Sequence, residues 1–287
     1  MATPRGSLLR GLGSAAVLLV QLLAPAGAVA AAADDGALSA TPAASYRKVP
    51  GGSLRSVLPA DGVDAPATVA PFLLRTTPVS VEEFRNFLAS HPEWQRGQIP
   101  GLFAAPGYLA AWQGDMDSNP LQANSPVTQV SWYAARAFCE AEGGRLPRWY
   151  EWEFAAAASA TRADAREDDE WLLKILSWYE RPGNVRPGAI GMDEANLYGI
   201  HNLHGLIWEW VDDFSGLFVN ADSRAKGEQK TMEFCGGAAV SLADRRNYAI
   251  LMRLALLAAM ESKQHGANMG FRCARDVESQ PQTADAQ

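Results

Sequence analysis

The chain is poor in cysteine and histidine, with three and four of these residues among 287. No CxxC pair is present, so the sequence supports neither a zinc ribbon nor a thioredoxin-like redox site. Basic residues are outnumbered by acidic ones, and the formal charge of −7 argues against a nucleic-acid binder. Hydrophobic residues at 48% and charged residues at 20% are instead typical of a globular protein.

The N-terminal 30 residues have the pattern of a signal peptide. Arg5 and Arg10 provide positive charge, residues 11–24 are apolar, and Ala28-Val29-Ala30 matches a cleavage site. We therefore expect export, which in a bacterium means the periplasm or beyond. No apolar run after this segment is long enough to span a bilayer, so we expect no membrane span after cleavage. In an oxidising compartment, three cysteines suggest one bridge and one buried thiol.

The remaining chain is divided by composition and by local structure signals. We expect a flexible leader over 31–44, one domain over 45–276 and a disordered tail over 277–287. Caps and apolar patterns predict helices over 81–88, 133–142, 149–158 and 171–179, strands from Tyr46 and over 69–74, 234–238 and 271–274, and an apolar segment over 248–260. The acidic run 164–170 is most simply a solvated face with first-turn helix charge.

The stretch 196–213 is the most informative part of the sequence. It contains Trp208-Glu209-Trp210, together with Gly199 and Gly205, which permit unusual backbone angles. We predict a loop that enters a buried strand, with Glu209 pointing inward between its Trp neighbours. An inward carboxylate beside loop carbonyls suits a hard cation such as Ca²⁺. The alternative is a carboxylate satisfied by backbone N–H groups or by an arginine.

Short motifs that follow one another over about 45–276 resemble one family, that of the formylglycine-generating enzyme (sulfatase-modifying factor). The motifs are Val49-Pro50-Gly51-Gly52, Thr77-Pro78-Val79-Ser80, Val130-Ser131-Trp132, Phe138-Cys139-Glu140, Arg145-Leu146-Pro147, Glu151-Trp152-Glu153-Phe154, His204-Gly205, Trp208-Glu209-Trp210 and Asn268-Met269-Gly270-Phe271-Arg272-Cys273. The resemblance implies a compact α+β fold with a C-type-lectin-like core, much irregular loop and bound calcium.

The resemblance also implies specific site residues. It places a calcium ion on Asn202, Gly205, Ile207 and Glu209, with the Gly and Ile acting through their backbone carbonyls. It pairs Cys139 with Cys273 in a disulfide. The partner of the family's other bridge is replaced by Ala156, and this leaves Cys235 as a free thiol.

The chain departs from the family where the family binds copper. The family's oxidase activity uses a Cys pair upstream of the Asn-x-Gly-Phe-Arg element, but no Cys occurs between Gly237 and Asn268, and Asp244 and Ala249 stand about where the pair would be. We therefore expect no copper and no formylglycine formation. The iron-dependent sulfoxide synthases of the superfamily take His ligands from a separate helical domain, and we expect no such domain here.

A subgroup of exported, Cys-poor members resembles this chain more closely, through Leu203–Phe214, Ser56–Pro59 and Thr161–Arg166. Its members act in the periplasmic maturation of the siderophore pyoverdine. The resemblance implies oxidation of the tetrahydropyrimidine ring of dihydropyoverdine, a peptide siderophore precursor as substrate, and other periplasmic maturation enzymes as partners. Accessory proteins of copper nitrite reductase look similar, so a non-catalytic binding protein is the alternative.

The family's site wall falls on the segment 244–265. Glu261 follows an apolar run, and partial burial would raise its pKa and suit it to proton abstraction. The alternative is a surface acid at a helix end. Asp244 and His265 are the other possible bases. Arg246 and Arg253 are candidate substrate ligands, although Arg253 and Arg272 also suit structural ion pairs. The sequence shows no redox cofactor, so the oxidant is oxygen or another external acceptor.

Overall fold

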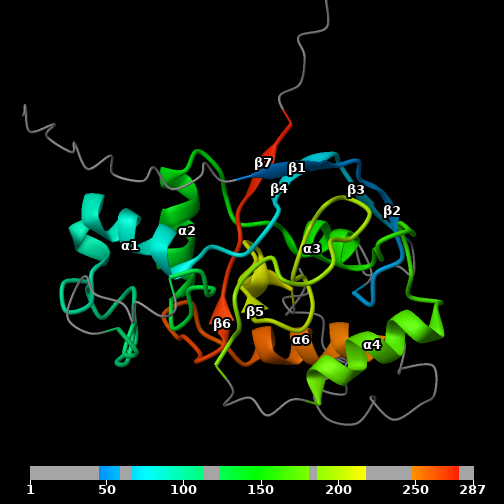
Figure 1. The fold of residues 1–287 in the computed structure, drawn as a ribbon. Helices are drawn as coiled ribbons and strands as arrows, with labels where there is room; N and C mark the ends of the chain where they lie inside the picture. The colour runs from blue at the N-terminus through cyan, green and yellow to red at the C-terminus, as the bar shows by residue number, and fades with distance from the viewer. Residues whose placement is uncertain (1–44, 59–65, 113–122, 181–185, 218–246, 278–287) are drawn as a thin grey trace, which may run out of the picture. The chain divides into compact units, whose positions relative to one another are not determined.

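The computed structural model describes residues 45–58, 66–112, 123–180, 186–217 and 247–277. Short helices and strands alternate there with long irregular segments (Figure 1), which confirms the predicted α+β class. The helices are α1 (Val81–Ser90), α2 (Trp132–Ala141), α3 (Trp149–Ala156), α4 (Asp169–Tyr179) and α6 (Tyr248–Ala258), with 3₁₀ turns η2 (Pro92–Trp94) and η4 (Phe214–Gly216). The strands are β1 (Tyr46–Val49), β2 (Gly52–Leu54), β3 (Ala67–Val69), β4 (Phe72–Arg75), β5 (Trp208–Glu209), β6 (Met269–Gly270) and β7 (Ala274–Asp276).

The strands form three small sheets. An antiparallel sheet has the order β1-β4-β7, β2 pairs antiparallel with β3, and β5 pairs parallel with β6. The strand predicted over 69–74 is in fact two strands, because Val69 pairs with Gly52 in one sheet and Phe72 pairs with Val49 in another. The chain changes sheets at the intervening residues, where Pro71 has no N–H to donate.

The last predicted strand, 271–274, is also corrected. The structure places β6 before it and β7 at its end, and the segment between them bonds to the end of β4 and to the loop before α1. The carbonyl of Phe271 accepts a hydrogen bond from the Val79 N–H, and the carbonyl of Cys273 accepts one from the Arg75 N–H. The predicted strand 234–238 lies outside the described residues.

Local sequence signals explain where the helices begin. Ser80 caps α1 in a capping box with Glu83, and Ser131 caps α2. Helix α4 begins at Asp169, two residues before the predicted start, because the carboxylate of Asp168 caps it by accepting the N–H groups of Glu170 and Trp171. Helix α3 ends two residues earlier than predicted, and the apolar segment predicted over 248–260 is helix α6.

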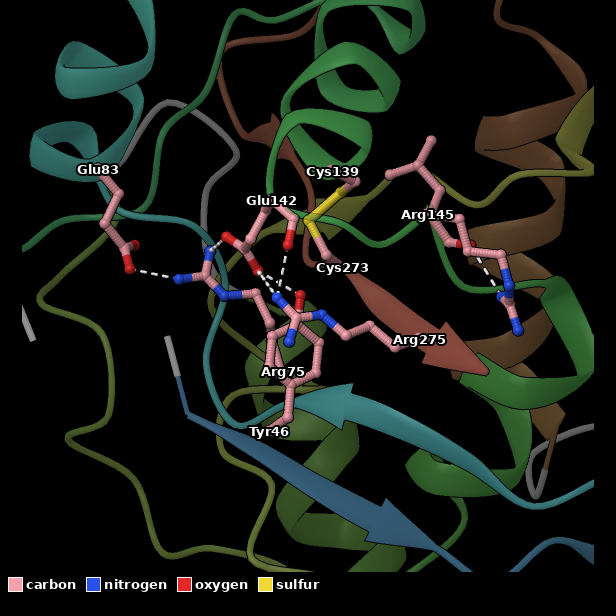
Figure 2. Close-up of a disulfide and its surroundings, with 9 residues drawn as sticks. Tyr46, Arg75, Glu83, Cys139, Glu142, Arg145, Cys273 and Arg275 are labelled. Carbon is pink, nitrogen blue, oxygen red and sulfur yellow. Dashed lines mark hydrogen bonds and ion pairs between the residues drawn. A yellow bond between two sulfur atoms is a disulfide. The ribbon is translucent and has the colours of Figure 1, made fainter. Parts of the chain in front are cut away.

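The predicted disulfide between Cys139 and Cys273 is confirmed, and it joins α2 to the chain just before β7 (Figure 2). The bridge closes a loop with a sequence separation of 134 residues. In the chain-entropy picture such a loop contributes about 3–5 kcal/mol to the free energy of unfolding. Cys235, predicted to be a free thiol, lies outside the described residues.

A polar cluster surrounds the disulfide (Figure 2). The Tyr46 hydroxyl donates to the Glu142 carboxylate, and Arg75 pairs with Glu83 and lies 3.5 Å from Glu142. The Arg275 guanidinium lies 4.1 Å from the centroid of the Tyr46 ring and donates to the Glu142 carbonyl. The cluster therefore joins β1, β4 and β7 to the C-terminal end of α2.

Among the described residues, no helix combines the length and the apolar character that a bilayer span requires. The proposed signal peptide (1–30), the leader (31–44) and residues 278–287 of the tail lie outside the described residues. Cleavage, export and the periplasmic location therefore stay predictions.

Candidate functional site

Glu209 on β5 lies at the middle of a buried polar group. Its side chain is 0% exposed, which confirms the inward orientation. Arg272 donates two hydrogen bonds to the carboxylate, from Nη2 to Oε1 at 2.8 Å and from Nε to Oε2 at 2.9 Å. Trp152 of α3 donates its indole N–H to Oε2 at 2.9 Å. The arginine partner that the sequence left as an alternative is therefore the arrangement in the structure.

Arg253 of α6 completes this group, and we call Glu209, Arg272, Trp152 and Arg253 the buried centre. The Arg253 guanidinium lies 3.5 Å from the centroid of the Trp152 ring and donates to the backbone carbonyl of Glu209. Burial lowers the pKa of Arg253 to about 10. The residue is only 2% exposed, and this conflicts with its predicted role as a substrate ligand.

The residues predicted to hold calcium have other partners. Asn202 Oδ1 accepts the Gly191 N–H at 2.7 Å, and its amide donates to Asp193 at 2.8 Å. Both oxygens of Glu209 are taken by Arg272 and Trp152. A divalent cation here would lie beside a buried guanidinium, which is electrostatically unfavourable.

This arrangement therefore does not fit the predicted set of Asn202, Gly205, Ile207 and Glu209. The described residues also contain no group of three or more His, Cys, Asp or Glu that could hold a metal ion. Calcium stays a prediction of the resemblance, and the hydrogen bonds of Asn202 and Glu209 do not support it.

His204 lies next to the buried centre. Its ring is edge-on to Trp152, with 5.8 Å between the centroids, and its Nε2 lies 2.8 Å from the Ala156 carbonyl. Burial lowers the pKa of His204 to about 4, although the bond to that carbonyl opposes the shift. His204 is therefore neutral at pH 7, with its Nε2–H donating to Ala156.

Glu261 is placed differently from the prediction. It follows the end of α6, and its side chain is 65% exposed and lies 3.3 Å from the Lys263 ammonium. The expected partial burial is wrong, because the helix that buries Leu254 and Leu257 ends at Ala258 and leaves Glu261 in the next turn. The alternative of a surface acid after a helix describes its position, and a catalytic role stays a prediction.

His265 shares this turn with Glu261. The Nε2 atom of His265 lies 3.1 Å from the Pro106 carbonyl, and its ring packs against Gly107, where an added Cβ would approach it to 3.1 Å. Asp244 and Arg246, the other predicted residues of this wall, lie outside the described residues. The structure thus brings Glu261 and His265 to one surface turn but leaves their predicted partners undescribed.

A second site was missed from the sequence. A cleft of about 610 Å³ lies between α4 and the segment 193–204, and we call it the α4 cleft. Its polar and aromatic lining consists of Ser159, Thr161, Asp168, Glu170, Trp171, Lys174, Trp178, Asp193, Glu194, Asn196, Asn202 and His204. Trp171 and Trp178 are seven residues apart and so lie on one face of α4, a signal that was available before the structure.

The chain matches known proteins over most of its length. The family model described as the sulfatase-modifying factor enzyme 1-like domain matches residues 36–277. The formylglycine-generating enzyme of Thermomonospora curvata is 26% identical over 283 residues, covering 79% of this chain and 92% of that protein. The formylglycine-generating enzyme of Streptomyces coelicolor is 29% identical over 174 residues, and the match spans about half of each protein (54% of each).

A solved structure, that of PvdO from Pseudomonas aeruginosa, superposes with a TM-score of 0.42 and 18% sequence identity. The superposition covers 81% of this chain and 94% of that one.

Proposed function

The chain belongs to the sulfatase-modifying factor enzyme 1-like domain family, and from this premise we propose that it is an exported maturation enzyme for pyoverdine. The family includes oxidative enzymes such as the formylglycine-generating enzymes. The proposed reaction oxidises the tetrahydropyrimidine ring of dihydropyoverdine to the final chromophore. The proposed substrate is therefore a small peptide siderophore precursor.

The observation that carries this proposal is that the chain has the buried residues of the family's central stretch but lacks the family's cysteine pair. The chain keeps Glu209 and Arg272 as a buried ion pair, with both side chains 0% exposed. It has no Cys between Gly237 and Asn268, so the copper-binding pair of the formylglycine-generating enzymes is missing. The Leu203–Phe214 version of the central stretch supports the assignment to the siderophore subgroup.

The reaction removes two electrons and two protons from one C–N bond of the ring. The ring N–H gives up a proton, the adjacent C–H gives up a hydride equivalent, and a C=N bond forms. Oxygen, which would be reduced to hydrogen peroxide, or another external two-electron acceptor takes the electrons. Glu261 is the candidate base for the proton, because the family resemblance places the wall of the site on the segment 244–265 that contains it.

Purified protein should convert dihydropyoverdine in air, with the change in absorbance reporting the chromophore. Glu261→Gln keeps the side-chain shape but removes proton acceptance, and we expect the rate to fall ~10²–10⁴-fold. Asp244→Asn and His265→Gln remove the other possible bases and serve as controls, and circular dichroism checks the fold. Full activity of Glu261→Gln would remove Glu261 from the mechanism, and loss only with Asp244→Asn would move the base there.

The second candidate is a non-catalytic accessory protein, for example for copper nitrite reductase. The observation that favours it is that Glu261 is exposed and paired with Lys263, as an ordinary surface acid would be. Wild-type protein that binds the precursor but leaves its absorbance unchanged, in air and with added oxidants, would favour this role over the enzyme.

A further inference from the structure

We propose that the α4 cleft binds a cationic ligand, one that carries alkylammonium or guanidinium groups on an apolar stem. The cleft is separate from the turn that holds Glu261 and His265, because neither residue lines it. Its volume of about 610 Å³ lies in the range of small-ligand sites. The inference goes beyond the proposed oxidation and does not depend on it.

Aromatic rings form the apolar part of the site. Trp178 stacks on His204 with 6.3 Å between the ring centroids, and Trp171 meets the same ring edge-on at 5.8 Å. His204 itself is buried. Indole rings attract ammonium and guanidinium groups through their negative faces.

The rim of the α4 cleft is acidic, and this determines the sign of the ligand. We define the rim by its four carboxylates, Asp168, Glu170, Asp193 and Glu194. Lys174 is the one cationic side chain among the described lining residues, and it lies 3.7 Å from Glu194. The rim therefore carries an excess of negative charge, which attracts cations toward the cleft.

The rim carboxylates differ in how many hydrogen bonds and ion pairs they already form within the protein. Asp168 caps α4 and lies 3.2 Å from the Arg162 guanidinium, and Asp193 accepts the Asn202 amide. Within the described ranges, neither Glu170 nor Asp193 forms an ion pair. Their charges are therefore available to a ligand, whereas the apolar stem of that ligand would pack on Trp171 and Trp178.

Binding of a defined peptide tests this proposal directly. N-acetylated trilysine amide is titrated into the purified full chain at 150 mM salt, with calorimetry and tryptophan fluorescence as readouts, and spermidine is titrated in parallel. We expect saturable binding of trilysine, no binding of triglutamate, and weaker binding as the salt concentration rises. Spermidine that binds as tightly as trilysine would identify a free polyamine as the source, and trilysine alone would identify a peptide.

A pair of matched variants locates the binding site. Glu170→Gln with Glu194→Gln removes two rim charges, and we expect the dissociation constant for trilysine to rise about 3- to 30-fold. Glu82→Gln with Glu93→Gln changes the net charge equally on exposed residues that do not line the cleft, and should leave the constant unchanged. Trp171→Leu, which retains apolar bulk, should weaken binding as well.

Absence of saturable trilysine binding would overturn the proposal. So would equal weakening by the two double variants, because the effect would then come from net charge alone. None of these measurements uses dihydropyoverdine or turnover, so failure here is distinguishable from failure of the proposed reaction. If the chain binds trilysine but does not oxidise the precursor, the α4 cleft remains a binding site and only the proposed enzymatic function is rejected.

Discussion

The buried centre and the α4 cleft lie on either side of His204, yet they use charge in opposite ways. In the buried centre, Glu209 and Arg272 are 0% exposed and satisfy each other through two hydrogen bonds. On the rim of the cleft, Glu170 and Glu194 are exposed, and the only ion pair that either forms among the described residues is the exposed pair of Glu194 with Lys174. The buried charges hold the fold together, whereas the carboxylate of Glu170 faces solvent and has no ion-pair partner among the described residues, so it can meet a ligand.

The difference separates acidic residues that stabilise the fold from acidic residues that can bind a ligand. A buried carboxylate that is already bound by a guanidinium and an indole N–H has little attraction left for a cation, however unusual its sequence surroundings are. Glu209 stands in the most distinctive stretch of the sequence, but its role in the structure is to receive Arg272 and Trp152. The rim acids lie in unremarkable charged sequence, and they became informative only when the cleft was known.

The largest loss of stability is expected from removing one member of the buried ion pair. Arg272→Met leaves the Glu209 carboxylate buried without its cation, and we expect the free energy of unfolding to fall by about 3–5 kcal/mol. Urea unfolding measures the loss. Glu194→Gln on the rim is the contrasting variant and should change the value by less than about 0.5 kcal/mol.

A double variant shows whether the two charges act as a pair. Glu209→Gln with Arg272→Met should cost less than the sum of the two single variants, because neither charge is then left buried alone. Additive losses would mean that the two side chains contribute independently.

His204, between the two regions, should make stability depend on pH. Its folded-state pKa of about 4 lies below the ordinary value of 6.5. Stability from this group is therefore fully present above pH 6.5 and is lost as the pH falls toward 4, because the unfolded chain takes up the proton first. We expect a loss of about 3 kcal/mol between pH 7 and pH 4 from this residue.

The measurement compares urea unfolding of the wild type and of His204→Gln at several pH values. Other acids titrate in both proteins, so the difference between them isolates His204. If both proteins lose the same stability over this range, His204 is not held neutral by burial.

Gly205 tests the packing that separates the two regions. It has a φ of +85°, and an added Cβ would lie 2.4 Å from the Trp178 ring. Gly205→Ala should therefore lower the free energy of unfolding by about 1–3 kcal/mol. Gly143→Ala is the control, because Gly143 has a φ of +76° but no atom near its missing Cβ. An equal loss in both variants would show that backbone strain alone matters and that the contact with Trp178 does not.

The smallest effect is expected from removing divalent cations. If Arg272 and Trp152 satisfy Glu209, as the hydrogen bonds indicate, EDTA should leave the melting temperature unchanged. Calcium bound at Asn202 and Glu209, as the family resemblance implies, would instead make the melting temperature fall with EDTA and recover with added calcium. Differential scanning calorimetry of the dialysed protein distinguishes the two outcomes.

Several features could be predicted without coordinates because their causes are local. Ser80 and Ser131 predicted the starts of α1 and α2, because the side chain of a capping residue bonds to N–H groups only a few residues away. The two Trp residues that flank Glu209 were the reason to expect its carboxylate inside. The disulfide between Cys139 and Cys273 came from the resemblance, because the pattern of Cys residues alone leaves the pairing open.

Features set by distant segments could not be predicted in the same way. Arg272 reaches Glu209 from 63 positions along the chain, so the choice between a cation and an arginine partner was open until the fold was known. The exposure of Glu261 depends on where α6 ends against its neighbours, and the burial of Arg253 depends on the Trp152 ring beneath it.

By itself, the sequence determined most helix starts, because a cap bonds to N–H groups within a few residues, and the Trp neighbours of Glu209 indicated its inward direction. The class of the fold followed from the family resemblance. Only the tertiary structure decided which partner neutralises Glu209 and where solvent reaches the chain. Both depend on segments such as α4 and the residues 193–204, which meet only after folding and enclose a cleft that no stretch of either contains alone.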